Sequence, residues 1–391
     1  MPRRAGVDKV AGVQPDVEVV VVGAGLAGSA TAWALARRGV SALVVERFEP
    51  GHARGSSHGS ARIVRRAYGE AEYTRLTGQA FELFTELEQR SRRPLLRMLG
   101  GLDFGAGRDT RAVSSYLTAS GVPHEILDAP QAHRRWPGMR FDGPVVFHEQ
   151  AGTMDAQGCV DAMLALAAAG GAVVRFGTAA RSVSVHSDLA RVELSDGSTV
   201  STRCAVVAAG AWVQPLIGAA VALPDLAVTQ QQVFHFPRLD PDAPPWPSVI
   251  HVLGGSDEIY HLAGGRDGGL ADDRKVAEHY YGRPVTGDSR DGVIDPESRA
   301  RITEYVKRWL PGLEPTPRAE ASCLYTRTPT EDFLIDRVGP IVVSSPCSGH
   351  GAKFAPLIGE FNARLACGDG LVPARFGLAH HAAAKPGAVS F

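Results

Sequence analysis

The chain has 391 residues, of which 44% are hydrophobic and 21% are charged, and its net charge is −1 at pH 7. This composition is ordinary for a soluble globular enzyme large enough for two closely joined domains, and the balanced charge argues against nucleic acid as a partner. The five cysteines are an odd number without C-x-x-C spacing, so neither a disulfide framework nor a metal site is expected.

A strand, a helix and a second strand are predicted in order near the start of the chain. Residues 17–22 (VEVVVV) form an apolar, β-branched run typical of a strand that is buried on both faces. Residues 29–38 are compatible with a helix, and residues 41–45 predict a second strand that ends at Glu46. This order is the one found in a dinucleotide-binding unit.

Between the first strand and the helix stands a G-x-G-x-x-G motif made of Gly23, Gly25 and Gly28. The first glycine allows a sharp turn, the second lets backbone approach a pyrophosphate, and the third lets the helix pack closely on the strand. The phosphates would then lie at the positive end of the helix dipole, and Glu46 would accept hydrogen bonds from a ribose. The motif predicts a dinucleotide site and leaves NAD, NADP and FAD open. The alternative is a chance glycine turn.

Three stretches of different composition follow, between residues 47 and 150. Residues 47–67 are rich in Gly, Ser, Arg and His, which predicts a loop over the face of a bound cofactor. Residues 73–91 carry apolar side chains at steps of three and four, as in an amphipathic helix. Residues 95–150 alternate short apolar runs with Gly and Pro, so we expect a small sheet with turns.

The middle of the chain predicts a helix followed by strands. The helix covers 160–169, and the strands cover 172–176, 181–186 and 190–194, with a hairpin turn at Asp196-Gly197. A further apolar strand, 204–209, runs into Gly210, which predicts a return to the cofactor sheet.

The remaining chain predicts a second, antiparallel domain over 225–320, where much of the proline and several aromatic residues lie. A strand at 341–343, a glycine-rich turn at 348–351 and a helix at 355–366 follow. The leader up to residue 16 and the tail after Phe376 are expected to be loose. No apolar run nears the ~20 residues that span a bilayer, so we expect no membrane segment and a cytoplasmic protein.

Four further motifs narrow the interpretation. They are Ser57-His58-Gly59 with Arg62 to Glu70, then Cys204 to Trp212, then Cys323 to Thr328 with Asp332 to Asp336, and Ser348 to Phe354. In this order and spacing, over roughly residues 17–370, the chain resembles the monomeric sarcosine oxidase and N-methyltryptophan oxidase family of the D-amino-acid-oxidase-like flavoproteins.

The resemblance implies that the cofactor is FAD. It also implies an α/β (α+β) fold, with a Rossmann-like FAD-binding domain and an inserted antiparallel-sheet substrate domain. The FAD-binding domain would comprise 17–85, 150–222 and 322–376, and the substrate domain 86–149 and 223–321. Residues 1–16 and 377–391 would be flexible termini.

The resemblance assigns three residues to covalent attachment and substrate binding. Cys323 matches the cysteine that forms a thioether to the 8α-methyl of the flavin, whereas its alternative role is that of a small buried hydrophobic residue. Arg65 and Lys353 match the two cations that hold the substrate carboxylate, for which an arginine fork and a lysine point charge are suited. Their alternative is that of solvated surface charges.

Four residues would surround the flavin ring by the same resemblance. Arg62 and His58 would lie beside the ring, or would instead order the loop that contains them. Lys275 would lie over the flavin through a water and promote the reaction with oxygen, and His279 completes the K-x-x-x-H spacing of that site. The connection 264–274 is about three residues longer than usual in the family, and the alternative for Lys275 is an exposed strand lysine.

Two departures from the family pattern bear on the substrate. His261 falls where a tyrosine commonly lines the pocket, and Ala61 stands where a threonine is expected. Both argue against strict specificity for sarcosine. Gly210, Gly349 and Gly351 are further expected cofactor contacts.

The implied activity is oxidation of a secondary (N-methyl or cyclic) amino acid to an imine, with reduction of O2 to H2O2. The partners would be a small amino acid and O2, and the protein would be a monomer. Alternatives are an oxidase of a bulky or cyclic imino acid in specialised metabolism, a dehydrogenase that passes electrons to another protein, and a flavin-binding protein without turnover.

Overall fold

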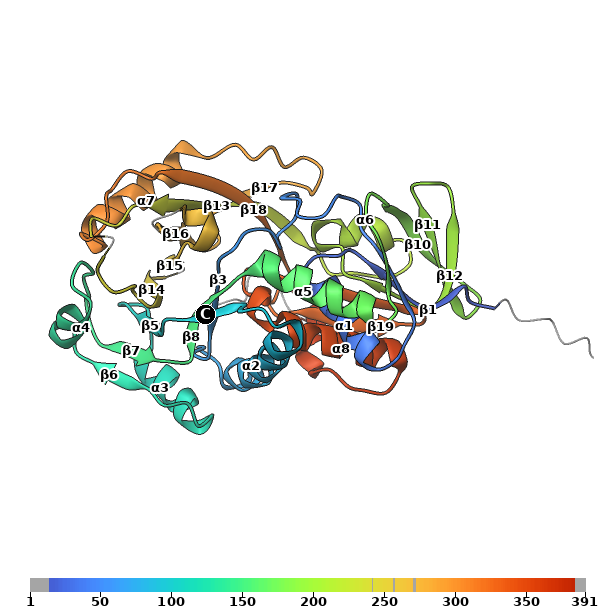
Figure 1. Cartoon of the computed structure of the whole chain (residues 1–391), viewed down its shortest axis with the longest axis horizontal. Helices are drawn as coiled ribbons and strands as arrows, with labels where there is room; N and C mark the ends of the chain where they lie inside the picture. Colours follow the sequence, from blue (N-terminus) through green and yellow to red (C-terminus); the bar gives the residue numbers. More distant parts are fainter. Residues whose placement is uncertain (1–13, 241, 256, 270–271, 384–391) are drawn as a thin grey trace, which may run out of the picture.

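Two large sheets and one small sheet organise the molecule (Figure 1). The structure is a computed structural model and describes residues 14–240, 242–255, 257–269 and 272–383. In the view of Figure 1 the strands β1 and β10–β12 lie to the right with helices α1, α5 and α8, and the strands β5–β7 and β13–β16 lie to the left. The predicted mixed α/β fold is confirmed.

The first large sheet has the order β10-β11-β12-β1-β2-β9, with β20 beside β12 and β19 beside β20. Its centre is parallel, since β1 runs parallel to both β2 and β12. The prediction that the strand after Cys204 returns to the cofactor sheet is therefore confirmed. The strands are β1 (Val17–Val22), β2 (Ala42–Val45), β9 (Val173–Arg175), β10 (Ala180–His186), β11 (Leu189–Leu194), β12 (Thr199–Val207), β19 (Leu334–Val338) and β20 (Ile341–Ser345).

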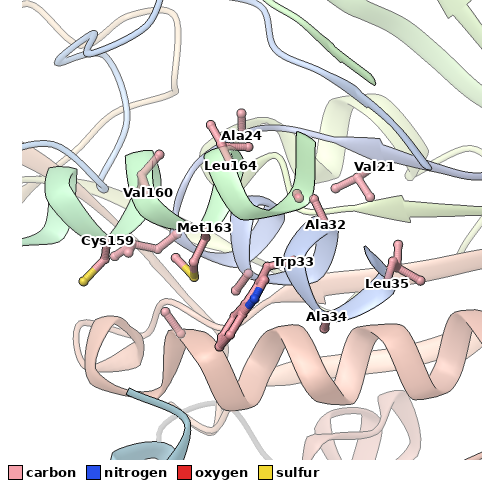
Figure 2. Close-up of a cluster of buried hydrophobic side chains, with 14 of the residues drawn as sticks. Val21, Ala24, Ala32, Trp33, Ala34, Leu35, Cys159, Val160, Met163 and Leu164 are labelled. Atoms are coloured by element: carbon pink, nitrogen blue, oxygen red, sulfur yellow. The ribbon is translucent and has the colours of Figure 1, made fainter. Parts of the chain in front are cut away.

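Helix α1 (Leu26–Arg37) is buried against α5 (Ala156–Ala169) and α8 (Ala355–Cys367) (Figure 2). Small side chains allow this: a Cβ on Gly359 of α8 would lie 2.4 Å from the backbone of Ala30. Figure 2 shows Trp33 pointing away from the sheet, toward α8. The helix begins three residues earlier than predicted, so Gly28 lies in its first turn.

The second large sheet has the order β17-β13-β16-β15-β14-β5-β7-β6, with β18 also paired to β13. It is antiparallel as predicted, apart from the parallel pair β14–β5. Its strands are β5 (Gly101–Phe104), β6 (Glu125–Leu127), β7 (Val145–His148), β13 (Ala227–Phe236), β14 (Ser248–Gly254), β15 (Asp257–Ala263), β16 (Arg274–Glu278), β17 (Arg283–Pro284) and β18 (Ala319–Arg327).

A three-stranded sheet, β3-β8-β4, contains part of the region predicted as loop. Within 47–67, residues 62–65 form β3 because they pair with β8, a partner some ninety residues away that local composition does not reveal. These strands are β3 (Arg62–Arg65), β4 (Leu96–Met98) and β8 (Ala151–Met154). The other helices are α2 (Ala71–Ser91), α3 (Thr110–Ala119), α4 (Ala129–Arg135), α6 (Val213–Ile217), α7 (Pro296–Trp309) and α9 (Leu378–Ala383), with short 3-10 turns η1 (Gly210–Trp212), η2 (Gly265–Gly268), η3 (Gly351–Phe354) and η4 (Ala374–Phe376).

Both described chain ends are attached to the fold. The Asp16 backbone N–H donates to the Ser201 carbonyl at 2.9 Å, and α9 buries His381, whose ring contacts Thr330 at 2.8 Å. The prediction of a loose tail is thus wrong for 378–383, while residues 1–13 and 384–391 lie outside the described residues. None of the described helices is long and apolar enough to span a bilayer.

Candidate active site

A cavity of about 470 Å³ is lined by both large sheets. The parallel sheet contributes the glycine turn after β1 and Glu46 after β2, and the antiparallel sheet contributes side chains of β15, β16 and β18. The loops 47–52 and 55–58, strand β3, helix α5 and the turn from 349 to 353 also line it. Segments far apart in the sequence thus meet at one cavity, as a long, extended ligand requires.

The glycine turn leaves room only for backbone. Gly23 has φ +100°, and a Cβ on Gly28 would lie 1.8 Å from the Gly23 carbonyl oxygen. A Cβ on Gly25 would lie 2.8 Å from the Ser57 hydroxyl, which itself accepts from the Leu26 backbone N–H at 2.9 Å. The backbone from Gly23 to Ala27 therefore lines the cavity at the N-terminus of α1, the place where a helix binds a pyrophosphate.

Glu46 lies in the wall of the same cavity and is nearly buried. Its carboxylate accepts from the Ala24 backbone N–H at 2.8 Å and from the Phe48 N–H at 3.0 Å. Gly210, with φ +54°, begins the turn after β12 and also lines the cavity. These features fit the adenosine and diphosphate part of FAD.

On the antiparallel sheet, alternate residues face the cavity. Along β15 the lining residues are Glu258, Tyr260 and Leu262. On the neighbouring strand β16 the lining residue is Lys275, and His279, the first residue after that strand, also lines the cavity. Successive side chains of a strand point to opposite faces, so the residues between these point into the other core.

His261 is one of those intervening residues, and the prediction that it lines the pocket is wrong. Its ring Nδ1 accepts from the Arg274 guanidinium at 2.9 Å, and both side chains are buried on the far face. Burial and the Arg274 charge hold the pKa of His261 well below its usual range. Tyr260 occupies the pocket instead, because a shift of one residue in a strand reverses every side chain.

Lys275 is buried, and its ammonium nitrogen donates to the Ala61 carbonyl at 3.0 Å. Burial, followed by the charge of Arg62, lowers the pKa of Lys275 to about 7. His279 lines the same cavity, and burial together with Lys353 lowers its pKa to about 3, so its ring is neutral. The structure therefore brings the predicted K-x-x-x-H pair to the cavity.

The long connection before Lys275 clamps the loop that carries Ala61. The Ser60 backbone N–H donates to the Asp267 carboxylate at 2.6 Å, and the Asp267 N–H donates to the Ser60 hydroxyl at 2.9 Å. The connection thus fastens the loop that supplies the Ala61 carbonyl to Lys275.

Arg65 and Lys353 meet at one aromatic ring. The Arg65 guanidinium lies 4.6 Å from the Tyr68 ring centre, and the Lys353 ammonium donates to the Tyr68 hydroxyl at 3.0 Å. Arg65 also pairs with Asp103 at 3.2 Å. Burial lowers the pKa of Arg65, but Asp103, Tyr68 and Glu258 together outweigh it, and the net shift is upward. Burial and Arg65 push the pKa of Lys353 well below its usual range. Both cations line the cavity, as carboxylate binding requires.

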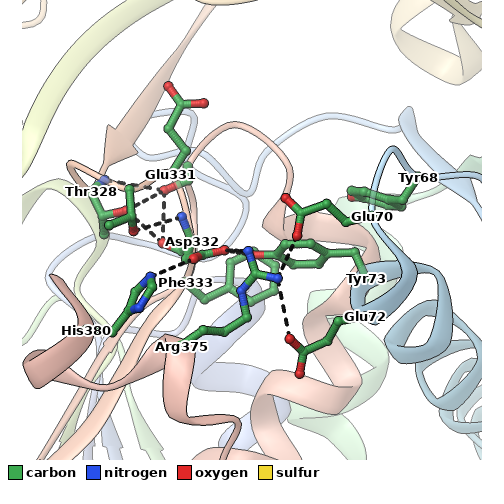
Figure 3. A network of polar contacts seen from close by, with 12 residues as sticks. Tyr68, Glu70, Glu72, Tyr73, Thr328, Glu331, Asp332, Phe333, Arg375 and His380 are labelled. Atoms are coloured by element: carbon green, nitrogen blue, oxygen red, sulfur yellow. Dashed lines mark hydrogen bonds and ion pairs between the residues drawn. The ribbon is translucent and has the colours of Figure 1, made fainter. Parts of the chain in front are cut away.

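A polar network lies behind this pair (Figure 3). Arg375 bonds to Asp332 at 2.7 Å and to Glu70 at 2.6 Å, while the Tyr73 hydroxyl donates to Asp332 at 2.8 Å. The Tyr73 ring stacks on Tyr68 with ring centres 5.3 Å apart. The network thereby fixes the ring that holds both cations.

Two cysteines line the cavity, Cys323 on β18 and Cys347 before the glycine-rich turn. Burial raises the pKa of Cys347. Gly349 and Gly351 also line the cavity, and a Cβ on Gly351 would lie 1.8 Å from the backbone of Pro346. The turn is therefore restricted to glycine by close backbone approach.

Arg62 and His58 both line the cavity and also order their own loop. The Arg62 guanidinium donates to the carbonyls of His58 at 2.7 Å and Ser56 at 3.1 Å. Burial and Arg62 lower the pKa of His58 to about 3. Arg62 therefore orders the loop that contains both residues, which is the alternative role considered for them.

Sequence reasoning gave no role to three residues of the cavity region: Glu258, Tyr260 and Tyr68. The first two belong to an alternating run, Glu258 to Leu262, which a strand-period analysis of that segment would have placed on one face. Tyr68 belongs to the motif from Arg62 to Glu70, which supports the resemblance but predicts no role for this tyrosine. Among the described residues, no group of three or more His, Cys, Asp or Glu side chains is placed to hold a metal ion.

Comparison with known proteins agrees with this geometry. Residues 18–365 match the family described as FAD dependent oxidoreductase. The chain is 31% identical to the monomeric sarcosine oxidase of Bacillus sp. (strain NS-129), over 89% of this chain and 92% of that one. It is 28% identical to the N-methyl-L-tryptophan oxidase of Yersinia pestis (strain Pestoides F), over 90% and 95% of the two chains.

Two solved structures are similar over almost their whole length. NikD, an unusual amino acid oxidase essential for nikkomycin biosynthesis, superposes with a TM-score of 0.81 at 25% identity, covering 93% of this chain and 97% of NikD. The L-proline dehydrogenase of P. horikoshii gives a TM-score of 0.80 at 19% identity, with the same coverages, and so shows the shared fold alone.

Proposed function

Because the chain belongs to the family of FAD-dependent oxidoreductases, we propose that it oxidises a secondary amino acid, N-methylated or cyclic, to an imine and passes the electrons to O2, forming H2O2. The observation that carries the proposal is the meeting of Arg65 and Lys353 at Tyr68, in the same cavity as the glycine turn and Lys275. The resemblance found in the sequence is confirmed at the level of the family.

When bound, FAD supplies the two-electron acceptor for a substrate C–H bond. The glycine turn and Glu46 would hold its adenosine and diphosphate part. Cys323 would hold its ring by a thioether, and Arg62 would lie beside the ring. The domain bounds predicted from the resemblance, and a monomeric state, belong to the same proposal.

The chain's own residues would position the substrate. Arg65 and Lys353 would bind its carboxylate, and a carboxylate beside Lys353 would favour the charged form of that lysine. His279 and Tyr260 would enclose the amine between neutral rings, because the pKa of His279 is lowered to about 3 and burial raises that of Tyr260 to about 12. The amine has to react without its extra proton, and neutral walls beside two cations disfavour an ammonium ion.

Lys275 would serve the second half of the reaction. Oxygen acquires negative charge as it is reduced, and a fixed ammonium held by the Ala61 carbonyl would stabilise that charge.

Oxygen consumption with stoichiometric peroxide, measured over a panel of N-methyl, cyclic and D-amino acids, tests the proposal. Flavin reduction without oxygen uptake would identify a dehydrogenase instead. The alternative that the sequence resemblance leaves open, a bulky or cyclic imino acid, is a second candidate substrate class, and the same panel separates the two.

The attachment of FAD through Cys323 is tested by acid precipitation. The wild-type pellet should stay yellow, and the pellet of Cys323→Ser should release its colour. Cys347→Ser is the matched control, since Cys347 lines the same cavity. A colourless wild-type pellet would contradict the thioether.

A further inference from the structure

Four carboxylates line the cavity, those of Glu46, Asp161, Glu258 and Asp288. Glu46, Asp161 and Asp288 each accept a hydrogen bond, from Ala24, Gln157 and Trp212 respectively, so Glu258 is the one whose role is open. It lies on β15 two residues before Tyr260 and points to the same face. Within the described part of the chain, no hydrogen bond or ion pair involves its side chain. Its backbone carbonyl accepts from the His279 N–H at 2.9 Å, which fixes the strand beneath it.

The cations nearest to Glu258 already have partners. Asp103 bonds to Arg65 at 3.2 Å and to Arg108 at 2.6 Å, and Lys353 donates to Tyr68. With Glu258 ionised and Lys353 in the charged form that a substrate carboxylate favours, this corner holds three cations (Arg65, Arg108 and Lys353) and two carboxylates (Asp103 and Glu258). One positive charge therefore remains, enough for one substrate carboxylate and not for two.

Glu258 also lies away from the residue proposed to act on oxygen. Leu262 pairs with Lys275 across β15 and β16, whereas Glu258 is four residues further along β15. At about 3.3 Å per residue this is a separation of roughly 13 Å along the strand. Glu258 consequently borders the part of the cavity that would hold the substrate beyond its reacting carbon.

We propose that Glu258 selects the substrate by its side chain or ring: the pocket takes a monocarboxylic secondary amino acid that carries an additional N–H donor, and rejects a second carboxylate. The inference rests on the proposed function and names the substrate class of that same site.

The physical reason is the cost of covering a half-buried carboxylate with a substrate that offers it no hydrogen-bond donor. Burial raises the pKa of Glu258, against the charges of Arg65 and Arg108 that lower it. A substrate N–H would satisfy this oxygen, an apolar group of the same shape would leave it unpaired, and a second carboxylate would be repelled.

A matched pair of ring compounds provides the test. Piperazine-2-carboxylate and piperidine-2-carboxylate differ at one ring position, a second amine against CH2. That second amine carries a proton at neutral pH and makes the reacting amine less basic, so the test compares how the ratio of their kcat/KM values changes between enzymes. We expect the preference for piperazine-2-carboxylate to be at least ~10-fold greater in wild type than in Glu258→Gln and in Glu258→Ala, the range for a charge-assisted hydrogen bond. The ratio cancels any general damage to catalysis.

A second pair tests the rejection. N-methyl-L-glutamate should be a poorer substrate than N-methyl-L-glutamine for wild type, and Glu258→Gln should narrow the difference. Asp257→Asn is the control, because Asp257 is an exposed carboxylate next in sequence that accepts from the Tyr281 hydroxyl. Its ratios should equal those of wild type.

The outcomes separate this inference from the proposed function. If Glu258→Gln lowers kcat/KM for both ring compounds by the same factor, or if wild type does not prefer piperazine-2-carboxylate more strongly than Glu258→Ala does, Glu258 does not select the substrate by its side chain or ring. Lack of turnover of both ring compounds by an enzyme that oxidises other secondary amino acids would also overturn it. If no amino acid reduces the wild-type flavin, the proposed function itself fails.

Discussion

The two large sheets build their halves of the cavity in different ways. The parallel sheet contributes backbone: a Cβ at Gly23, Gly25 or Gly28 would lie within 2.8 Å of another atom, and the turn from Gly23 to Ala27 lines the cavity. The antiparallel sheet contributes side chains from alternate positions, such as Tyr260 and Lys275. A backbone site depends on which residues have no Cβ, whereas a side-chain site depends on which face each strand presents.

This difference determines how each half tolerates change. A side chain added at Gly23 or Gly28 meets backbone that cannot move away, so the strand and the helix would have to separate. A substitution on the antiparallel sheet removes one chemical group and leaves the sheet intact. The predictions below test the contrast in order of expected effect.

The largest effect is expected for Gly28→Ala. The new Cβ would lie 1.8 Å from the Gly23 carbonyl oxygen, so α1 would have to shift away from β1. We expect loss of bound flavin and destabilisation of about 3 kcal/mol or more, as for severe overpacking. Flavin absorbance per protein and thermal unfolding measure both.

Gly143→Ala is the matched control, since a Cβ there meets no atom within 4 Å. Its flavin content and unfolding temperature should equal those of wild type. A Gly28→Ala protein with a full complement of flavin would contradict the backbone account.

The next largest effect is expected for Lys275→Met. Loss of the ammonium should slow the reaction of the reduced enzyme with oxygen by at least ~100-fold, a barrier change near 2.7 kcal/mol, with far less effect on anaerobic reduction. Rapid mixing resolves the two half-reactions. Lys307→Met, which removes a surface lysine paired with Glu304, should change neither.

The pH dependence of the same reaction follows from the Lys275 pKa of about 7. The ammonium exists below this pH, so the wild-type oxygen reaction should slow as pH rises through about 7. The Lys275→Met enzyme should lack this slope. Equal slopes in both enzymes would assign the titration to another group.

A smaller effect is expected at the carboxylate pair. Arg65→Met and Lys353→Met should each weaken binding of substrate and of simple carboxylates by roughly 10- to 150-fold, the loss of one charge-assisted contact of ~1.5–3 kcal/mol. Flavin content should stay normal. Arg66→Met is the control, because Arg66 bonds to Thr77 and Gln150 and does not line the cavity. Turnover of a substrate ester as fast as the free acid would show that the carboxylate is not bound by this pair.

The smallest effects separate two adjacent residues. Tyr260→Phe should change kinetic constants by about tenfold or less and leave stability unchanged, since it removes one hydroxyl from the cavity wall. His261→Leu should cost about 1–3 kcal/mol of stability, because Arg274 loses its buried acceptor, and should leave the kinetics unchanged. If His261→Leu changed the kinetic constants and left stability unchanged, His261 would line the pocket after all.

The same contrast explains what the sequence predicts well. Glycine spacing, the buried first strand and the terminal Glu46 are local constraints, and the structure reproduces the predicted unit to within a few residues. Lys275, Arg65 and Lys353 were placed by motifs, and all three line the cavity.

What the sequence did not predict depends on distant pairing. The strand at 62–65 forms against β8, and the helix at 378–383 forms where its buried His381 contacts the loop at Thr330. The face of β15 is a different case: the motif match placed His261 in the pocket, one residue from Tyr260, and alternation in a strand turns such a shift into an inversion. Alternation along Glu258 to Leu262 would have placed Glu258 and Tyr260 on one face.

Anaerobic flavin reduction tests the central proposal most directly, since it requires both halves of the cavity at once. Oxygen-free wild-type enzyme mixed with secondary amino acids should lose its oxidised-flavin absorbance with at least one of them, and the methyl ester of that substrate should bleach it far more slowly. An enzyme that carries flavin and is bleached by no amino acid, or equally by acid and ester, would contradict an amino acid oxidase that holds its substrate through Arg65 and Lys353.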